Sequence, residues 1–179
     1  MINITTYPSK LGNILLASKN DALIGLWIEG QKYAFSNIHE KIIENPNDAI
    51  LVQTKNWLDL YFNHQNPDIL QLKLAPEGGE FRQMVWKLLL QIPYGTTTTY
   101  NDLAKKIAKQ KGIKKMSAQA IGNAVGHNPI SIIIPCHRVV GSNGSLTGYA
   151  GGIDKKIFLL KHEKVDMKNL FVPKKGTAL

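Results

Sequence analysis

The first part of the chain contains three short segments rich in apolar residues, 2–7, 13–18 and 22–28. The turn-rich pieces PSKLG and KND separate them. Short segments of this kind bounded by turn residues predict short antiparallel strands. A further strand is expected over 69–74, because apolar residues recur there directly after a proline.

A helix is expected between the third and the last of these strands. Five residues recur at the spacing of one helical face: Ile50, Thr54, Trp57, Leu58 and Tyr61. Either Asn47 or Asp48 can accept hydrogen bonds at the start of this helix. The segment 75–79, APEGG, breaks both kinds of periodicity and predicts a linker. We therefore place a domain boundary at residue 78.

Beyond the linker the period becomes helical. One apolar stripe, Phe81, Val85, Leu88, Leu89 and Ile92, precedes the Pro-Tyr-Gly stop at 93–95. Thr99 and Asp102 have capping-box spacing and predict a second helix. Ser117 is a good N-cap for a third helix over 118–125 that ends at Gly126. Two short helices joined by a turn predict a helix-turn-helix, although an ordinary helical hairpin packed in a core fits the same pattern.

The last part of the chain contains a short apolar run followed by turns and a helix. The run 130–134 is β-branched and too short for a helix, so we expect it to be buried and extended. It leads directly into Pro-Cys-His-Arg at 135–138. Asn143-Gly144 predicts a turn, 148–152 a flexible loop, and Asp154 is expected to cap a final helix that ends near residue 162.

These elements define the expected fold class, which is α/β with two domains. Residues 1–77 should form a small N-terminal antiparallel sheet with a helix. Residues 78–170 should form a mainly helical domain that contains the helix-turn-helix. Residues 171–179 should be a flexible tail.

The charge of the chain is distributed unevenly between these two domains. Residues 1–77 hold 6 Lys and Arg against 8 Asp and Glu, whereas 78–179 hold 16 against 5, which gives net charges of −2 and +11. A basic half of this size indicates a polyanionic partner for the second domain. The charge pattern alone also fits lysines that only aid solubility.

The composition of the chain limits its cellular location and the kinds of binding site that it can form. The chain contains no run of 18 or more apolar residues and does not begin like a signal peptide, so we expect no membrane partner and a cytoplasmic location. One cysteine cannot form an internal disulfide, and the five histidines lack ligand spacing. We expect no metal and no cofactor.

The single cysteine, Cys136, is a candidate nucleophile. A thiol reacts as its thiolate, which needs a cation, a histidine base or a helix N-terminus nearby. His137 and Arg138 follow it directly, and Glu163 is a candidate to orient the histidine. Because adjacent side chains seldom point the same way, a water relay between Cys136 and His137 is expected. Without further information, a buried inert thiol fits these residues as well.

The wider motif decides between these readings. The stretch IPCHRVVGSNGSLTGYAGG, with GNAVGHNP upstream and a TY-x-x-LA element before it, closely resembles the O6-alkylguanine-DNA alkyltransferase family. These proteins are also called methylated-DNA-protein-cysteine methyltransferases. The resemblance is strong over about 79–165, whereas the first 75 residues agree only in layout.

The resemblance implies direct-reversal DNA repair by a monomer that acts on double-stranded DNA. A methyl or other alkyl group of O6-alkylguanine is transferred irreversibly to Cys136, with no cofactor, and O4-alkylthymine is a further candidate substrate. His137 would take the thiol proton through a water, Glu163 would hold His137, and Asn128 would brace the turn. Tyr100 would press on a backbone phosphate and donate a proton toward the departing guanine.

The resemblance also assigns the DNA contacts and the pocket. Residues 117–126 would be the recognition helix that enters the minor groove and displaces the damaged base, because an O6 group inside the stack is out of reach. The implied DNA contacts are Ser117, Ala118, Gln119, Ala120, Gly122 and Arg138. The implied pocket residues are Val139, Tyr149, Ala150, Gly151 and Lys156, and the carbonyls of Val139 and Cys136 would read the exocyclic amine of guanine.

Two positions depart from the family pattern. Many members carry an arginine at the position of Gln119, where it fills the gap left by the displaced base, so base extrusion is expected to be less efficient here. Some members carry a serine at the position of Ala150, where this chain offers only a backbone N–H.

Three competing functions remain to be separated. They are a Cys-His hydrolase that turns over repeatedly, a lesion-binding protein with weak transfer activity, and a transcription factor that uses only the helix-turn-helix. The hydrolase requires direct contact between the cysteine and a general base, and it requires an oxyanion hole. The lesion-binding function is disfavoured because lesion-binding relatives lack the acceptor cysteine that this chain has. The transcription factor is disfavoured because alanines in a minor groove distinguish few DNA sequences.

Overall fold

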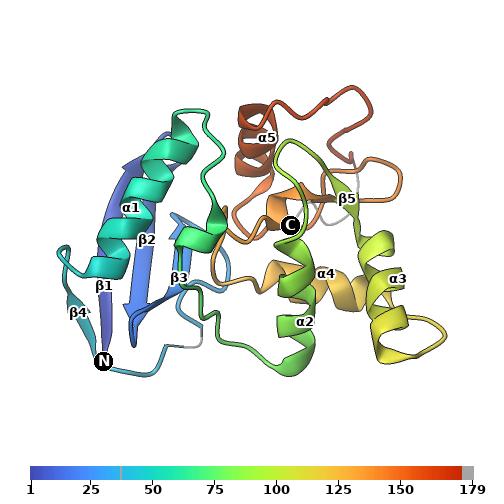
Figure 1. Ribbon diagram of the computed structural model, residues 1–179. Coiled ribbons are helices and arrows are strands. Elements are labelled where there is room, and N and C mark those ends of the chain that lie inside the picture. Colours follow the sequence, from blue (N-terminus) through green and yellow to red (C-terminus); the bar gives the residue numbers. More distant parts are fainter. Residues whose placement is uncertain (37, 175–179) are drawn as a thin grey trace. The chain divides into compact units, whose positions relative to one another are not determined.

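A computed structural model describes residues 1–36 and 38–174, and these residues form two compact units (Figure 1). The first unit comprises residues 1–36 and 38–77 together with 129–133, and the second comprises 78–128 together with 134–174. Within the described ranges, no helix is both long and apolar enough to cross a membrane.

The first unit contains a four-stranded sheet in the order β3-β2-β1-β4. Its strands are β1 (Ile2–Ser9), β2 (Gly12–Lys19), β3 (Ala22–Ile28) and β4 (Ile42–Glu44). The first three pair antiparallel, as predicted, but β4 pairs parallel with β1 and makes the sheet mixed. The edge strand β4 was missed because three residues are too few to show alternation.

Both faces of this sheet are covered. Helix α1 (Ala49–Phe62) packs against β1, β2 and β3, and its N-terminus is capped by Asp48, whose side chain accepts hydrogen bonds from the amides of Ile50 and Leu51. On β2, Leu15 and Ala17 pack in a cluster around Trp27, so Leu16 between them points to the opposite face.

The strand expected over 69–74 is wrong. Residues Ile69–Gln71 form a 3-10 turn, and only Leu74 makes an isolated bridge, to Leu23 of β3. The side chain of Asp68 accepts a hydrogen bond from the amide of Leu70 at 2.9 Å and thereby caps the turn. This local cap competes successfully with strand pairing.

The second unit is mainly helical. It contains α2 (Glu80–Leu89), α3 (Tyr100–Lys111), α4 (Ala118–Gly126) and α5 (Ile153–His162). A two-residue strand β5 (Thr98–Thr99) pairs parallel with β6 (Val139–Val140), a pairing that the sequence did not predict. The indole N–H of Trp86 on α2 donates to the carbonyl of Ala124 at 2.9 Å, which fixes α2 against α4.

Helices α3 and α4 form the predicted helix-turn-helix, and both predicted caps are present (Figure 1). The Thr99 hydroxyl accepts from the amide of Asp102 at 3.1 Å, and the Ser117 hydroxyl accepts from the amides of Gln119 and Ala120. Gly112 ends α3 in the left-handed conformation with φ 63°, which glycine adopts without strain.

The apolar run 130–134 is buried, as expected, but it is not extended. Ile130 bridges to Leu26 of β3, and the chain then turns through Ile132, which has φ 68°. The Ser131 hydroxyl donates to the side chain of Gln31 at 2.9 Å, and its backbone N–H donates to the carbonyl of Leu26. These contacts hold a β-branched residue in a conformation that its side chain disfavours.

Two expectations near the C-terminus are corrected. Helix α5 begins after Gly152, which has φ 95°, and Asp154 lies in the first turn without capping it. Phe171 does not belong to a flexible tail, because its N–H donates to Gly144 and its carbonyl accepts from Leu146. Residues 175–179 of the expected tail lie outside the described residues.

Candidate active site

The only cysteine lies in a short turn of the second unit. Residues Cys136–Arg138 form a 3-10 helix that follows Pro135 and leads into β6. The Cys136 N–H donates to the carbonyl of Ile134 at 2.8 Å, and the Arg138 N–H donates to that of Pro135 at 3.0 Å. Cys136 is only 5% exposed. The turn, together with the pairing of β6 with β5, holds the thiol in a fixed, nearly enclosed position.

Asn128 connects this turn to the helix-turn-helix. It lies two residues beyond the end of α4 and is 2% exposed. Its amide Nδ2 donates to the carbonyl of Ile134 at 2.8 Å and lies 3.2 Å from Sγ of Cys136. An N–H donor at this distance favours a sulfur that carries negative charge. The amide therefore braces the turn and is placed where it can stabilise a thiolate.

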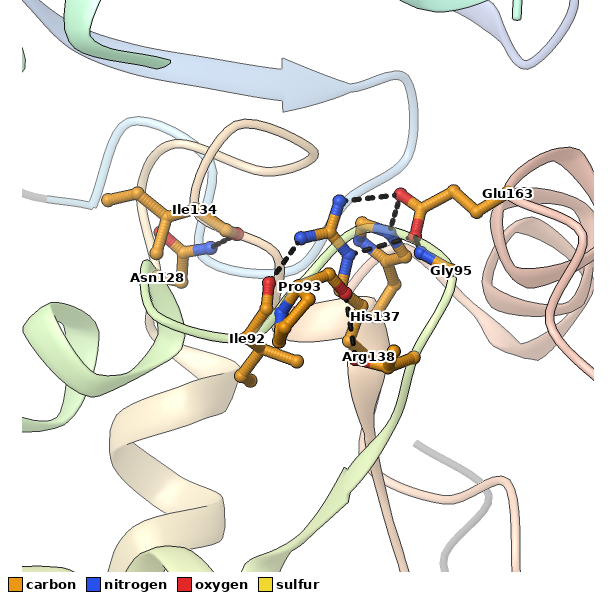
Figure 2. A network of polar contacts seen from close by, with 9 residues as sticks. Ile92, Pro93, Gly95, Asn128, Ile134, His137, Arg138 and Glu163 are labelled. Carbon is orange, nitrogen blue, oxygen red and sulfur yellow. Dashed lines mark hydrogen bonds and ion pairs between the residues drawn. The ribbon is translucent and has the colours of Figure 1, made fainter. Parts of the chain in front are cut away.

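A buried acid lies between the two residues that follow the cysteine. Glu163, directly after α5, contacts Nε2 of His137 at 2.6 Å and Nε of Arg138 at 2.8 Å. Nη2 of Arg138 donates to Oε1 of Glu163 at 3.0 Å, and the Gly95 N–H donates to Oε2 at 3.3 Å. Figure 2 shows the Glu163 carboxylate facing the His137 ring and the Arg138 guanidinium. Nη1 of Arg138 donates to the carbonyl of Ile92 at 2.6 Å.

The charges in this network follow from its contacts. Burial opposes ionisation of Glu163, but the contacts with His137 and Arg138 outweigh burial and hold the pKa of Glu163 well below its usual value. Burial lowers the pKa of His137 more than Glu163 raises it, and the cations of Arg138 and Lys156 lower it further. At neutral pH the network therefore contains an anionic Glu163, a cationic Arg138 and a neutral His137.

The neutral His137 ring has one nitrogen available as a base. Nε2 lies against an anionic oxygen, so this nitrogen carries the hydrogen and donates it, and Nδ1 retains the lone pair. Nδ1 is buried, and among the described residues no protein group forms a hydrogen bond with it. His137 can therefore accept a proton at Nδ1, while Glu163 stabilises the resulting imidazolium.

Tyr100 and Lys156 meet at the carbonyl of Thr147. The Tyr100 hydroxyl donates to this carbonyl at 2.9 Å, and Nζ of Lys156 donates to it at 2.8 Å and to the carbonyl of Val139 at 2.5 Å. Burial and the nearby Cys136 raise the pKa of Tyr100, so it stays a neutral donor. Burial lowers the pKa of Lys156 to about 8, although Cys136 acts in the opposite direction.

Of the predicted pocket residues, Lys156 contacts this carbonyl and that of Val139, and the other three lie in the loop before α5. Tyr149 is 2% exposed, and Ala150 and Gly151 are half-buried in the loop before α5. Gly148 has φ 78°, and a Cβ there would lie 2.5 Å from the Tyr100 hydroxyl oxygen. Only glycine allows the loop to pass this close to Tyr100.

The predicted DNA contacts differ in how exposed their side chains are, and five of the six lie at or near the start of α4. Ser117, Ala118 and Gln119 are exposed at the start of α4, and Ala120 and Gly122 are half-buried on it. Arg138 is a correction, because its guanidinium is buried and its donors are used by Glu163 and Ile92. The sequence showed its charge but not the direction of its side chain.

Three backbone groups of the site were missed. The carbonyls of Ile92 and Thr147 accept hydrogen bonds from Arg138, Tyr100 and Lys156, and the N–H of Gly95 donates to Glu163. A backbone group has no residue-type signature, so only the Pro-Tyr-Gly stop at 93–95 pointed to a tight turn there. No group of three or more possible metal ligands occurs among residues 1–36 and 38–174.

Comparisons with known proteins agree over nearly the whole chain. Residues 80–165 match the family described as "6-O-methylguanine DNA methyltransferase, DNA binding domain", and residues 2–76 match its "ribonuclease-like domain". A methylated-DNA–protein-cysteine methyltransferase of Methanosarcina acetivorans is 43% identical over 162 residues, which cover 88% of this chain and 95% of the relative. The Haemophilus influenzae protein of that name is 38% identical, covering 90% and 86%.

A solved structure agrees with these sequence matches. The crystal structure of Mycobacterium tuberculosis OGT in complex with DNA superposes with a TM-score of 0.77 at 36% identity, covering 90% of this chain and 92% of that chain. Both family matches, the extent of the relatives and the fold lead to one assignment. The chain belongs to the 6-O-methylguanine DNA methyltransferase family.

Proposed function

We propose that this protein repairs DNA by moving the alkyl group of an O6-alkylated guanine in duplex DNA onto Cys136. The observation that carries the proposal is the set of buried polar groups beside this cysteine. Asn128 donates to its sulfur, and an oriented neutral histidine supported by an anionic Glu163 follows it. The family to which the chain belongs supports the same reaction.

The nucleophile is the Cys136 thiolate. His137 accepts the thiol proton at Nδ1 through a water, since its other nitrogen is occupied by Glu163. The resulting positive charge on His137 lies against the Glu163 carboxylate, and Asn128 stabilises the negative sulfur. Each group thus favours the ionised pair over the neutral pair.

The transfer step breaks one bond and forms one. The sulfur attacks the alkyl carbon, an S–C bond forms, and the C–O6 bond breaks with its electron pair remaining on the guanine oxygen. Guanine gains the proton that balances the one lost by the thiol. The raised pKa keeps the Tyr100 hydroxyl protonated, and this hydroxyl turns its hydrogen from the carbonyl of Thr147 to the departing base as a hydrogen-bond donor.

The product explains single turnover. A thioether has no acyl carbon for water to attack, so neither His137 nor Glu163 can release the alkyl group. One acceptor cysteine then gives one repaired base for each chain. This distinguishes the protein from a Cys-His hydrolase, which regenerates its thiol.

In this proposal α4 is the recognition helix that contacts the DNA duplex. The target base must leave the stack to reach the buried sulfur, and Gln119 is exposed at the start of α4, where it can take the place of that base. Val139, Tyr149, Ala150, Gly151 and Lys156 would form the pocket. We propose a monomer that acts in the cytoplasm, where a lone cysteine stays reduced.

Variants of Cys136 test this function. Cys136→Ala and Cys136→Ser should lose all transfer from a duplex containing O6-methylguanine, while their affinity for the duplex stays within about twofold of wild type, because DNA affinity comes mainly from phosphate contacts. Transfer is measured with radiolabelled methyl groups, and affinity by fluorescence anisotropy. Repair that persists in Cys136→Ala would refute the mechanism. Tight lesion binding by a wild-type protein that transfers almost nothing would favour the lesion-binding function.

A further inference from the structure

The second half of α3 and the turn that follows it carry a concentration of positive charge. Six of the eleven residues from 105 to 115 are lysines, and all six are exposed: Lys105, Lys106, Lys109, Lys111, Lys114 and Lys115. Asp102 lies 3.9 Å from Lys105, and in the described part of the chain the other five lysines have no ion-pair partner. The segment is a concentrated cationic surface that the proposed chemistry does not use.

Helix stability explains only part of this cluster. Lys109 and Lys111 lie in the last turn of α3, where cations interact favourably with the helix dipole. Gly112 ends the helix, so Lys114 and Lys115 lie beyond the range of that effect. Like charges this close in sequence repel one another in the absence of an anion. The cluster therefore costs stability unless an anionic partner neutralises it.

The location of the cluster identifies the partner. It lies immediately before Ser117, the N-cap of the recognition helix, and residues 116–128 contain no Asp, Glu, Lys or Arg. In Figure 1 the yellow segment between α3 and α4 extends away from both helices. A neutral helix has no charge with which to hold a duplex, whereas lysines beside it can reach the phosphates that flank its groove.

We propose that residues 109–115 form a lysine clamp that binds backbone phosphates of duplex DNA beside the groove occupied by α4. This inference rests on the proposed function and adds a division of roles to it. Lysine ammonium groups bind phosphate as point charges and read no sequence. The clamp therefore holds damaged and undamaged duplex equally, and α4 and the pocket select the lesion.

Neutralising three lysines of the clamp tests this division. The variant Lys111→Gln/Lys114→Gln/Lys115→Gln is compared with Lys87→Gln/Lys161→Gln/Lys168→Gln, which removes three exposed lysines elsewhere in the same unit. Binding of an undamaged duplex is measured by fluorescence anisotropy over a range of salt concentrations. The clamp variant should lower the slope of log K against log salt by about 2–3 and raise Kd at least about tenfold at ~0.1 M salt.

The control variant should change the slope by less than about one. Equal effects of the two variants would overturn the clamp, because they would show that only total charge matters. The double variant Lys114→Gln/Lys115→Gln changes only residues outside the helices, so a loss of about 2 in slope from it cannot come from unfolding of α3.

Reaction with the free base O6-benzylguanine separates this inference from the proposed function. A free base has no phosphates, so its rate should be the same in wild type and in the clamp variant. A large loss of this rate would show that the lysines act on the pocket and would overturn the clamp. A wild-type protein that reacts neither with the free base nor with a duplex containing O6-methylguanine would refute the proposed function itself.

Discussion

Strand β3 and the segment 130–140 are both completely buried, yet they are held in different ways. In β3 every residue is apolar or glycine, and its backbone bonds to β2 on one side and to backbone groups of residues 73–75 and 129–131 on the other. The segment 130–140 contains a histidine and an arginine and is mostly turns. Its conformation depends on side chains outside the segment, namely Asn128, Glu163 and Gln31.

The two regions differ in how well they tolerate substitutions and in whether they can position reactive side chains. A sheet ladder is formed by backbone groups, so it tolerates changes of side chain that keep the core filled. A turn held by side chains places each donor at one position, but it fails when one partner is lost, because a buried charge is then left unpaired. The reactive thiol lies on the second kind of structure, where Asn128 and His137 can be aimed at it.

The largest effect is expected at Glu163. Glu163→Gln leaves the buried Arg138 without its counter-charge and should lower the free energy of unfolding by about 3–5 kcal/mol. It also removes the anion that supports protonated His137, so transfer to the folded fraction should slow by about a hundredfold or more. Urea denaturation gives the stability, and the rate with free O6-benzylguanine gives the chemistry.

Glu44→Gln is the matched control for this substitution. Glu44 is exposed on the edge strand β4, so its replacement should change neither measurement appreciably. A Glu163→Gln protein that is as stable and as reactive as wild type would show that the buried network is not what holds the site.

A core truncation in the sheet should affect stability alone. Leu16 of β2 is fully buried, and Leu16→Ala should lower the free energy of unfolding by about 2–5 kcal/mol because it leaves a cavity. The rate with free O6-benzylguanine, corrected for the folded fraction, should stay within about twofold of wild type. A large loss of rate in the fully folded variant would contradict the separation between the two regions.

The smallest effect is a pH dependence that comes from His137. Burial holds its pKa below the usual value, so below about pH 6.5 the unfolded chain binds a proton that the folded chain does not. The free energy of unfolding should therefore fall as the pH is lowered, by at most about 1 kcal/mol for this residue between pH 7 and 5.5. Denaturation at both pH values, compared with His137→Asn, isolates this contribution.

In the same comparison, a His137→Asn protein that loses as much stability as wild type on acidification would contradict a neutral His137. The contribution of Glu163 lies in a separate window. Its lowered pKa means that the stability it provides is lost only as the pH falls below about 4.5.

Local signals in the sequence were reliable where one residue determines one contact. The caps at Thr99 and Ser117 were predicted from residue type and spacing, and both are present. Of the two candidates Asn47 and Asp48, Asp48 caps α1. The cap predicted at Asp154 by the same rule is absent. The strand expected over 69–74 was wrong because Asp68 caps a competing turn. The turn at 130–134 was missed because its cause, contacts with Gln31 and Leu26, lies about a hundred residues away in sequence.

The site was accessible from the sequence mainly through its resemblance to a family. Twenty-six residues separate His137 from Glu163, and no spacing rule connects two residues so far apart. Arg138 shows the limit of residue type, because a cation was assigned to DNA although its side chain points into the protein. The acceptor carbonyl of Thr147 could not be found without the structure.

Locating the transferred group tests the central claim most directly. The wild-type protein is incubated with an excess of duplex containing O6-methylguanine and digested, and the peptides are analysed by mass spectrometry. We expect one methyl group for each chain, carried by the peptide that contains Cys136, and one guanine repaired for each chain. A methyl group on another residue, no transfer, or the repair of several guanines by one chain would contradict the account.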